Sequence, residues 1–105
     1  MTKTNITIKT SDKVEVTRAQ AWAIERAHHH YLEIAKKADR EEVIKMCGDC
    51  TPVEYARLLL LRTHFAVKIG DLEPWFGLYG PLNSMSADEL NMALLNGYVM
   101  KEGAE

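Results

Sequence analysis

The spacing of apolar residues divides the chain into helical and extended segments. Apolar side chains that recur every three or four positions form one face of a helix, whereas alternation of apolar and polar residues is typical of a strand. Helical spacing predicts four helices, over residues 18–37, 40–47, 52–69 and 87–96. Alternation predicts three short strands, over residues 6–8, 14–16 and 98–101. Residues 71–85 follow neither pattern.

Local signals mark where the predicted helices begin and end. In a capping box, a Ser or Thr is followed three positions later by Glu or Gln, and both side chains bond to free backbone N–H groups. Three helices start with such a pair: Thr17–Gln20, Thr51–Glu54 and Ser86–Glu89. Asp39 with Glu42 gives the short helix a similar start. Glycines, which tolerate the left-handed conformation of a helix end, follow at positions 48, 70 and 97.

These elements predict an α+β fold in a single domain, residues 1–105. We expect a bundle of about four helices with a small antiparallel sheet, in which the C-terminal strand joins an N-terminal hairpin. The helix over residues 52–69 is apolar on most sides, so it is expected to lie at the centre. The short helix is expected to bury Val43, Ile44 and Met46.

Composition and charge narrow the classes of function. Of 105 residues, 47% are hydrophobic and 27% charged, which is ordinary for a globular protein. The net charge is −2, so the chain lacks the excess of basic residues that is typical of nucleic-acid-binding proteins, and nucleic acid is not favoured as a partner. The longest aliphatic run, Leu58–Leu61, is far shorter than the ~20 apolar residues of a membrane span, and the N-terminus shows no signal peptide. We therefore expect a cytoplasmic protein with no membrane partner.

Cys47 and Cys50 form a C-x-x-C motif, which binds zinc when two more ligands approach. His64 is the candidate third ligand, although it is expected on the polar flank of its helix. No second C-x-x-C follows, and the histidines at positions 28–30 point about 100° apart on a helix, so they do not converge on one ion. Because a reducing cytosol keeps thiols free, the motif is interpreted as two thiols around Gly48, with no metal and no cofactor.

Catalytic motifs are missing from the sequence. It contains no Gly-rich phosphate loop, no H-E-x-x-H motif and no recognisable Ser-His-Asp arrangement. The acidic pairs Glu41–Glu42 and Asp88–Glu89 fall in first helical turns, where they complement the helix dipole. We therefore expect a protein that is not an enzyme.

The segment Trp75-Phe76-Gly77-Leu78-Tyr79 concentrates large apolar side chains between Gly70 and Gly80-Pro81. Aromatic side chains dominate many binding hot spots, so Glu73, Trp75, Phe76 and Tyr79 are the candidate partner-binding residues. We expect Trp75 and Leu78 to anchor the loop while Phe76 or Tyr79 stays available. The alternative is that the whole loop folds back and caps the core.

Residues 14–25 contain the pattern V-T-x-x-Q-A-x-A-I-E. Residues 82–99 follow the pattern L-N-x-x-S-x-D-E-L-x-x-A-L-x-x-G-Y-x-V up to its last position, where Met100 stands in place of valine. With these two patterns the chain resembles a group of small uncharacterised accessory proteins from phages and prophages of Gram-positive bacteria. The two segments cover about a third of the chain, and the resemblance implies a phage accessory protein with no catalytic residues to carry over.

Three functions are consistent with these observations. The first is a non-enzymatic protein that binds and modulates, as an inhibitor, a host or phage protein such as a defence or replication enzyme in the host cytoplasm. The second is a regulator associated with nucleic acid, with or without a structural zinc, which would use the basic residues Arg18, Arg26, Lys36, Lys37 and Arg40. The third is a small metal or thiol enzyme. The sequence favours the first.

Overall fold

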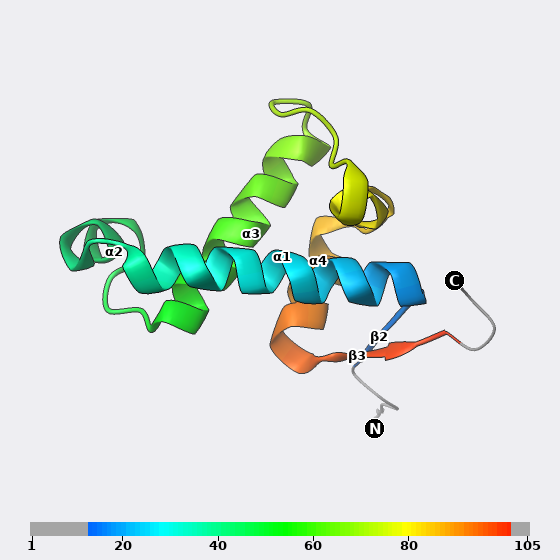
Figure 1. Cartoon of the computed structure of the whole chain (residues 1–105), viewed down its shortest axis with the longest axis horizontal. Coiled ribbons are helices and arrows are strands. Elements are labelled where there is room, and N and C mark those ends of the chain that lie inside the picture. Colours follow the sequence, from blue (N-terminus) through cyan, green and yellow to red (C-terminus); the bar gives the residue numbers. More distant parts are fainter. Residues whose placement is uncertain (1–12, 102–105) are drawn as a thin grey trace, which may run out of the picture.

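Helix α1 (Arg18–Lys37) runs along the length of the molecule, and the other elements pack across it (Figure 1). The computed structural model describes residues 13–101. Strand β2 (Val14–Val16) precedes α1. After α1 come α2 (Arg40–Cys47), α3 (Pro52–Lys68), the 3-10 helix η1 (Gly77–Ser84), α4 (Ala87–Asn96) and β3 (Tyr98–Met100). These bounds confirm the four predicted helices and the strands expected near residues 14–16 and 98–101. The expected number of about four helices is too low, because η1 lies within residues 71–85, where no element was predicted. The strand expected over residues 6–8 lies outside the described residues.

The predicted capping boxes set the helix starts. Thr17 Oγ1 accepts a hydrogen bond from the Gln20 backbone N–H at 3.0 Å, and Gln20 Oε1 accepts one from the Thr17 N–H at 2.9 Å. The same reciprocal pairs begin α3 and α4. Each box satisfies two backbone donors that a helix start leaves without an intrahelical partner.

The main core lies where α1 crosses α3, η1 and α4. Its buried side chains come from all of these elements and from β2: Val16, Ala21, Ala23, Ile24, Ala27, Leu60, Leu82, Met85, Leu90 and Ala93. Alanines on α1 let the α3 backbone come close, and α3 also touches η1 and α4. Helix α3 is therefore central, as expected, although Val53 and Phe65 leave one side of it exposed.

A smaller core cluster joins α2 to the far ends of α1 and α3. It consists of Ala35, Val43, Tyr55 and Ala56. Only Val43 of the short helix is buried, so the expectation that Ile44 and Met46 are buried is wrong. The reason is that α2 is packed on one side only, which leaves the rest of its surface to water (Figure 1). None of the helices within residues 13–101 has the length and apolarity that crossing a membrane requires.

Strands β2 and β3 pair in parallel, with Val14 opposite Tyr98 and Val16 opposite Met100. The C-terminal strand therefore joins the N-terminal part of the chain, as expected, but the predicted antiparallel direction is wrong for this pair. All the helices described within residues 13–101 lie between the two strands, and this long crossover returns the chain to the end of the sheet where β2 began. The backbone N–H of Lys101 extends the ladder by donating to the Val16 carbonyl at 2.8 Å.

Candidate functional site

The segment between α3 and α4 forms a loop that the Asn83 side chain holds closed. Its amide oxygen accepts from the Trp75 backbone N–H at 2.9 Å, and its amide nitrogen donates to the Trp75 carbonyl at 2.8 Å. The Asn83 carbonyl in turn accepts from Lys68 Nζ at 2.7 Å. The Asn83 amide thus satisfies both backbone polar groups of Trp75, which ties the start of the loop to its end.

The Trp75 side chain reaches inward to His64 on α3. The indole N–H donates to His64 Nδ1 at 3.1 Å, and His64 Nε2 lies 2.9 Å from the Met85 carbonyl oxygen. Indole nitrogen is only a donor, so Nδ1 must be unprotonated and Nε2 must carry the proton that it donates to Met85. His64 is therefore a neutral imidazole in a single tautomer, with both nitrogens bonded.

His64 is 0% exposed, so the prediction that it lies on the polar flank of its helix is wrong. The loop and η1 return over this part of α3 and cover the ring, which the pattern of α3 alone does not indicate. Burial lowers the pKa of His64 from its ordinary value of 6.5, because the imidazolium would lose its hydration. The positive charge of Lys68 lowers the pKa further, whereas the hydrogen bond to Met85 opposes the shift.

The aromatic residues of the loop divide into an anchoring set and an exposed set. Trp75 and Tyr79 are half-buried against the main core, with their rings edge to face at 5.8 Å between centroids. Phe76 is 84% exposed, and Leu72 and Leu78 are exposed beside it. The expectations that Trp75 anchors the loop and that Phe76 stays available are confirmed. The anchoring role expected of Leu78 is wrong, because Tyr79 takes it.

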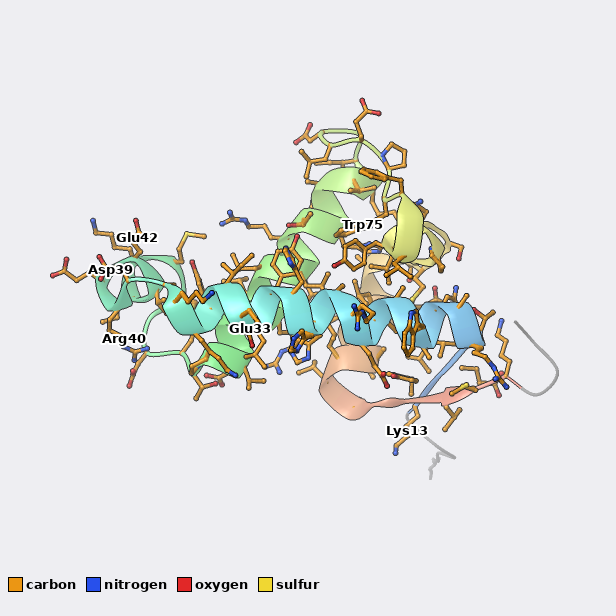
Figure 2. All side chains as sticks on the ribbon, viewed as in Figure 1. Lys13, Glu33, Asp39, Arg40, Glu42 and Trp75 are labelled. Carbon is orange, nitrogen blue, oxygen red and sulfur yellow. A yellow bond between two sulfur atoms is a disulfide. The ribbon has the colours of Figure 1, made fainter. Side chains whose placement is uncertain are left out.

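An apolar groove of about 500 Å³ runs between α3 and this loop. The end of α3 and the labelled Trp75 mark its position in Figure 2. All four predicted partner-binding residues line it: Glu73, Trp75, Phe76 and Tyr79. The four candidates thus lie together at one groove, and Thr63 and Val67 of α3 form its opposite wall.

Two acidic residues, Glu73 in the lining of this groove and Asp71 two positions before it, have no side-chain partner within residues 13–101. Asp71 and Glu73 are both exposed, and neither side chain forms an ion pair or a hydrogen bond with any residue between 13 and 101. A negative rim beside exposed apolar side chains favours a positively charged counterpart. We call residues 71–79 with Thr63 and Val67 the loop surface.

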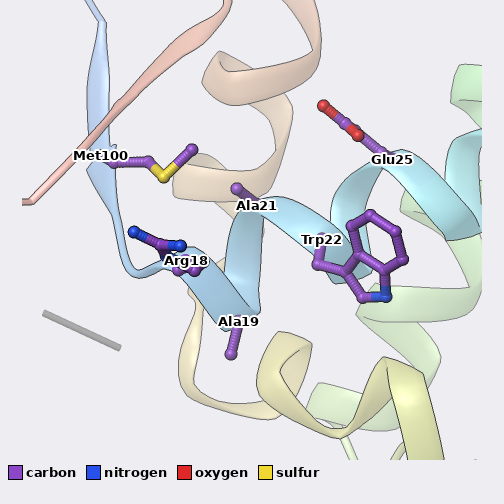
Figure 3. A pocket seen from close by; sticks show the side chains of 6 residues that line it. All are labelled: Arg18, Ala19, Ala21, Trp22, Glu25 and Met100. Atoms are coloured by element: carbon purple, nitrogen blue, oxygen red, sulfur yellow. The ribbon is translucent and has the colours of Figure 1, made fainter.

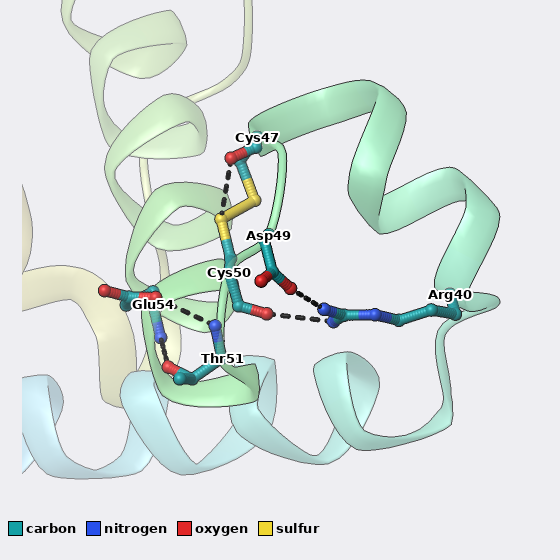
Figure 4. The surroundings of a disulfide bond; sticks show 6 residues. All are labelled: Arg40, Cys47, Asp49, Cys50, Thr51 and Glu54. Atoms are coloured by element: carbon teal, nitrogen blue, oxygen red, sulfur yellow. Dashed lines mark hydrogen bonds and ion pairs between the residues drawn. A yellow bond between two sulfur atoms is a disulfide. The ribbon is translucent and has the colours of Figure 1, made fainter.

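Cys47 and Cys50 form a disulfide, so the interpretation of the motif as two free thiols is wrong (Figure 4). Gly48, with φ of +76°, turns the chain back after α2. The turn brings the two Cα atoms to 6.2 Å, a separation that a disulfide spans. Arg40 closes the same turn by donating to the Cys50 carbonyl at 2.9 Å and by pairing with Asp49.

The zinc site considered from the sequence does not assemble. Cys47 and Cys50 are joined to each other, and His64 lies about 18 Å further along α3 from its start, at 1.5 Å per residue. Both His64 nitrogens already have partners. Within residues 13–101, no group of three or more His, Cys, Asp or Glu side chains is arranged to hold a metal ion.

The basic residues considered for nucleic-acid binding do not form one patch. Lys36 pairs with Glu33 at 3.7 Å, and Arg40 pairs with Asp49. Lys36 lies in the last turn of α1 and Arg40 begins α2, whereas Arg18 and Arg26 lie in the first half of α1. A continuous basic track for a phosphate backbone is therefore not formed by these residues.

Comparison of the chain with protein-family models, with curated proteins and with solved structures finds no match in any of the three.

Proposed function

We propose that this chain is a non-enzymatic accessory protein of the phage type, which binds a host or phage protein and modulates it, in the simplest case by inhibition. The observation that supports the proposal most directly is Phe76, which is 84% exposed on a loop of defined shape. An aromatic ring in water gains free energy when a partner buries it, and such residues carry much of the binding energy of interfaces. The resemblance of residues 14–25 and 82–99 to phage and prophage proteins supports the phage assignment.

The chemistry of the loop surface indicates what the partner presents. The exposed Phe76, Leu72 and Leu78 fit an apolar pocket on the partner. The carboxylates of Asp71 and Glu73, which pair with nothing in the described part of the chain, favour Arg or Lys at the rim of that pocket. Because Asn83 and His64 already hold the loop, binding costs little ordering entropy. These features suit a protein partner such as a host defence or replication enzyme.

Affinity capture with the full-length chain from a Gram-positive host lysate, followed by mass spectrometry and a binding measurement on the purified partner, tests the proposal. Phe76→Ala is expected to weaken binding by at least about thirtyfold. It should leave the melting temperature unchanged, because the ring makes few contacts. Leu95→Ala is the matched control, since Leu95 is 52% exposed on α4, away from the loop surface.

The proposal fails if no partner distinguishes the wild type from Phe76→Ala. It also fails if variants of the loop surface lose binding only in proportion to their loss of stability. That second result would assign the loop to the core alone.

A further inference from the structure

His64 can hold the Trp75 side chain only as a neutral imidazole. The indole nitrogen of Trp75 lies 3.1 Å from Nδ1 and has only a hydrogen to offer, so Nδ1 must supply a lone pair. A second proton on His64 must go to Nδ1, because Nε2 already carries the one that it donates to Met85. Two N–H groups would then face each other, and the hydrogen bond to Trp75 would be lost.

The orientation of the two rings offers a charged His64 no substitute attraction. The ring planes are 22° apart and the centroids are 6.3 Å apart, so the indole presents its N–H edge to the imidazole. The edge of an aromatic ring is its positive part, whereas a cation is attracted to the face. An imidazolium would therefore be repelled by the edge of Trp75 that the neutral ring binds.

An imidazolium at this position would also be cut off from water. His64 is fully buried, and this burial lowers its pKa because the charged ring would lose its hydration. Trp75 is partly exposed and is bonded directly to the ring. Displacement of the Trp75 side chain would therefore let water reach a protonated His64.

The charged groups around His64 do not stabilise the imidazolium. Lys68 lies one turn further along α3, and its positive charge lowers the pKa of His64. The other titratable side chains on the segments around it include His30 and Tyr31 of α1, Glu73 of the loop, Tyr79 of η1, and Asp88 and Glu89 of α4. None of these contributes a charge that raises the pKa of His64. The response to pH at this point in the core therefore belongs to His64 itself.

The Trp75 side chain also shapes the loop surface. It lines the groove together with Phe76 and the α3 residues Thr63 and Val67. The amide of Asn83 holds only the backbone of Trp75, whereas the indole N–H donates to His64. If the bond to His64 is lost, the wall of the groove can move while the backbone of the loop stays tied.

We propose that protonation of His64 releases the Trp75 side chain from the core and with it the binding shape of the loop surface. The groove is formed while His64 is neutral and is lost as the pH falls. The release of Trp75 is a property of the chain alone, whereas the effect on a partner rests on the function proposed above. Because one proton is taken up on release, the Kd for a partner should rise by at most about tenfold per pH unit below the folded pKa of His64.

The fluorescence of Trp75 in the full-length chain tests the release with no partner present. Trp22→Phe leaves Trp75 as the only tryptophan. Between pH 8 and pH 4.5 we expect its emission to move to longer wavelength in a one-proton step below 6.5, while the helical circular dichroism stays constant. In the same background, His64→Gln has no titrating ring and should show no step.

His30→Gln is the matched control for the fluorescence experiment. It removes the histidine whose ring lies 6.4 Å from that of Tyr79, and it should leave the step at the same pH. Nitrogen NMR of the imidazoles in the wild type needs no substitution at His64. It should show Nδ1 of His64 without a proton at neutral pH and protonated in the same step.

Three results would overturn the release of Trp75. They are an emission that stays constant until the helices unfold, a step that persists in His64→Gln, and a proton on Nδ1 of His64 at neutral pH. A partner captured as described above should bind the wild type more weakly below the step but should bind His64→Gln equally at both pH values. Wild-type binding that ignores the step would refute the coupling. A step without any partner would refute the proposed function alone, and the release of Trp75 would stand.

Discussion

The indole N–H of Trp75 and Nδ1 of His64 are 3.1 Å apart, so a loop side chain and a side chain of the central helix satisfy each other in the core. The bond determines the tautomer of His64, and the tautomer in turn directs Nε2 to the Met85 carbonyl. One imidazole thus connects α3, the loop and Met85 at the end of η1. The position of Phe76 next to Trp75 depends on this connection.

Replacing Trp75 by Phe removes the indole donor and leaves Nδ1 of a fully buried histidine without a partner. We expect a loss of about 1–3 kcal/mol in the free energy of unfolding, measured by urea denaturation. Trp22→Phe is the matched control, because that ring is exposed and its change should stay within about 0.5 kcal/mol. Equal costs for the two variants would contradict the role assigned to the bond.

The stability of the protein should fall as the pH drops below about 6.5. The pKa of His64 is lowered in the folded state, so near pH 6 the unfolded chain binds more protons than the folded one. The stabilisation is complete above 6.5 and is lost as the pH falls toward the folded pKa. His28 contributes in the same direction, because burial and then the charge of Arg57 lower its pKa.

Urea midpoints measured from pH 7.5 to pH 5 check this dependence. His64→Gln removes a titrating group and should flatten the slope, which for one group is at most about 1.4 kcal/mol per pH unit. His29→Gln removes an exposed histidine and serves as the control. A His64→Gln variant with the wild-type slope would show that His64 does not titrate in this range.

Tyr98 predicts a second loss of stability, at high pH. Burial, followed by the hydrogen bond to Glu25 and its charge, raises the pKa of Tyr98 to about 12. The neutral phenol is thus favoured in the folded state, and its stabilisation is lost as the pH rises from the ordinary value of 10.0 through the folded value. The stability difference between wild type and Tyr98→Phe should therefore shrink above pH 10. A difference that stays constant up to the alkaline unfolding limit would refute this assignment.

Leu60→Ala should cost about 2–5 kcal/mol, because Leu60 is fully buried where α1 crosses α3 and its loss leaves a cavity. Leu95→Ala is the same chemical change at an exposed position on α4 and should cost much less. Chemical denaturation of the two variants provides the comparison. Similar costs would mean that α3 is not the centre of the core.

The purified chain should contain no free thiols under non-reducing conditions, as a thiol-specific reagent can show. The disulfide closes a ring of only four residues, so replacing both cysteines by Ser should cost at most about 2 kcal/mol by chain entropy. In this variant α2 should be the first helix to unfold on heating, because it packs only on the small core cluster next to the disulfide. Two titratable thiols in the folded, unreduced protein would contradict the disulfide.

The helices could be predicted because the signals that start and end them lie within a few residues of one another. The capping box of Thr51 and Glu54, for example, is complete within four residues, and its hydrogen bonds form wherever α3 lies. The loop surface was predictable in part for the same reason, since residues 73–79 are adjacent in the chain. What the sequence did not indicate are relationships between distant segments. Neither the burial of His64 under η1 nor the parallel direction of β2 and β3 leaves a periodic trace.

The groove between α1 and β3 shows the same limit. Trp22 lies on α1, whereas Met100, which also lines the groove, comes from β3 near the other end of the described residues (Figure 3). The Cys47–Cys50 disulfide was missed for another reason, because a C-x-x-C motif is compatible with thiols, metal and disulfide alike.

The pairing of β2 with β3 has a consequence for how the protein is made. Val16 is fully buried, and its carbonyl accepts from the backbone N–H of Lys101. A ribosome must therefore deliver the residues up to Lys101 before β2 can pair with β3. The helices can form during synthesis, but the sheet can close only after the C-terminal strand has left the exit tunnel. Until that moment the edge of β2 that pairs with β3 lacks this partner, and an open strand edge can pair with another nascent chain.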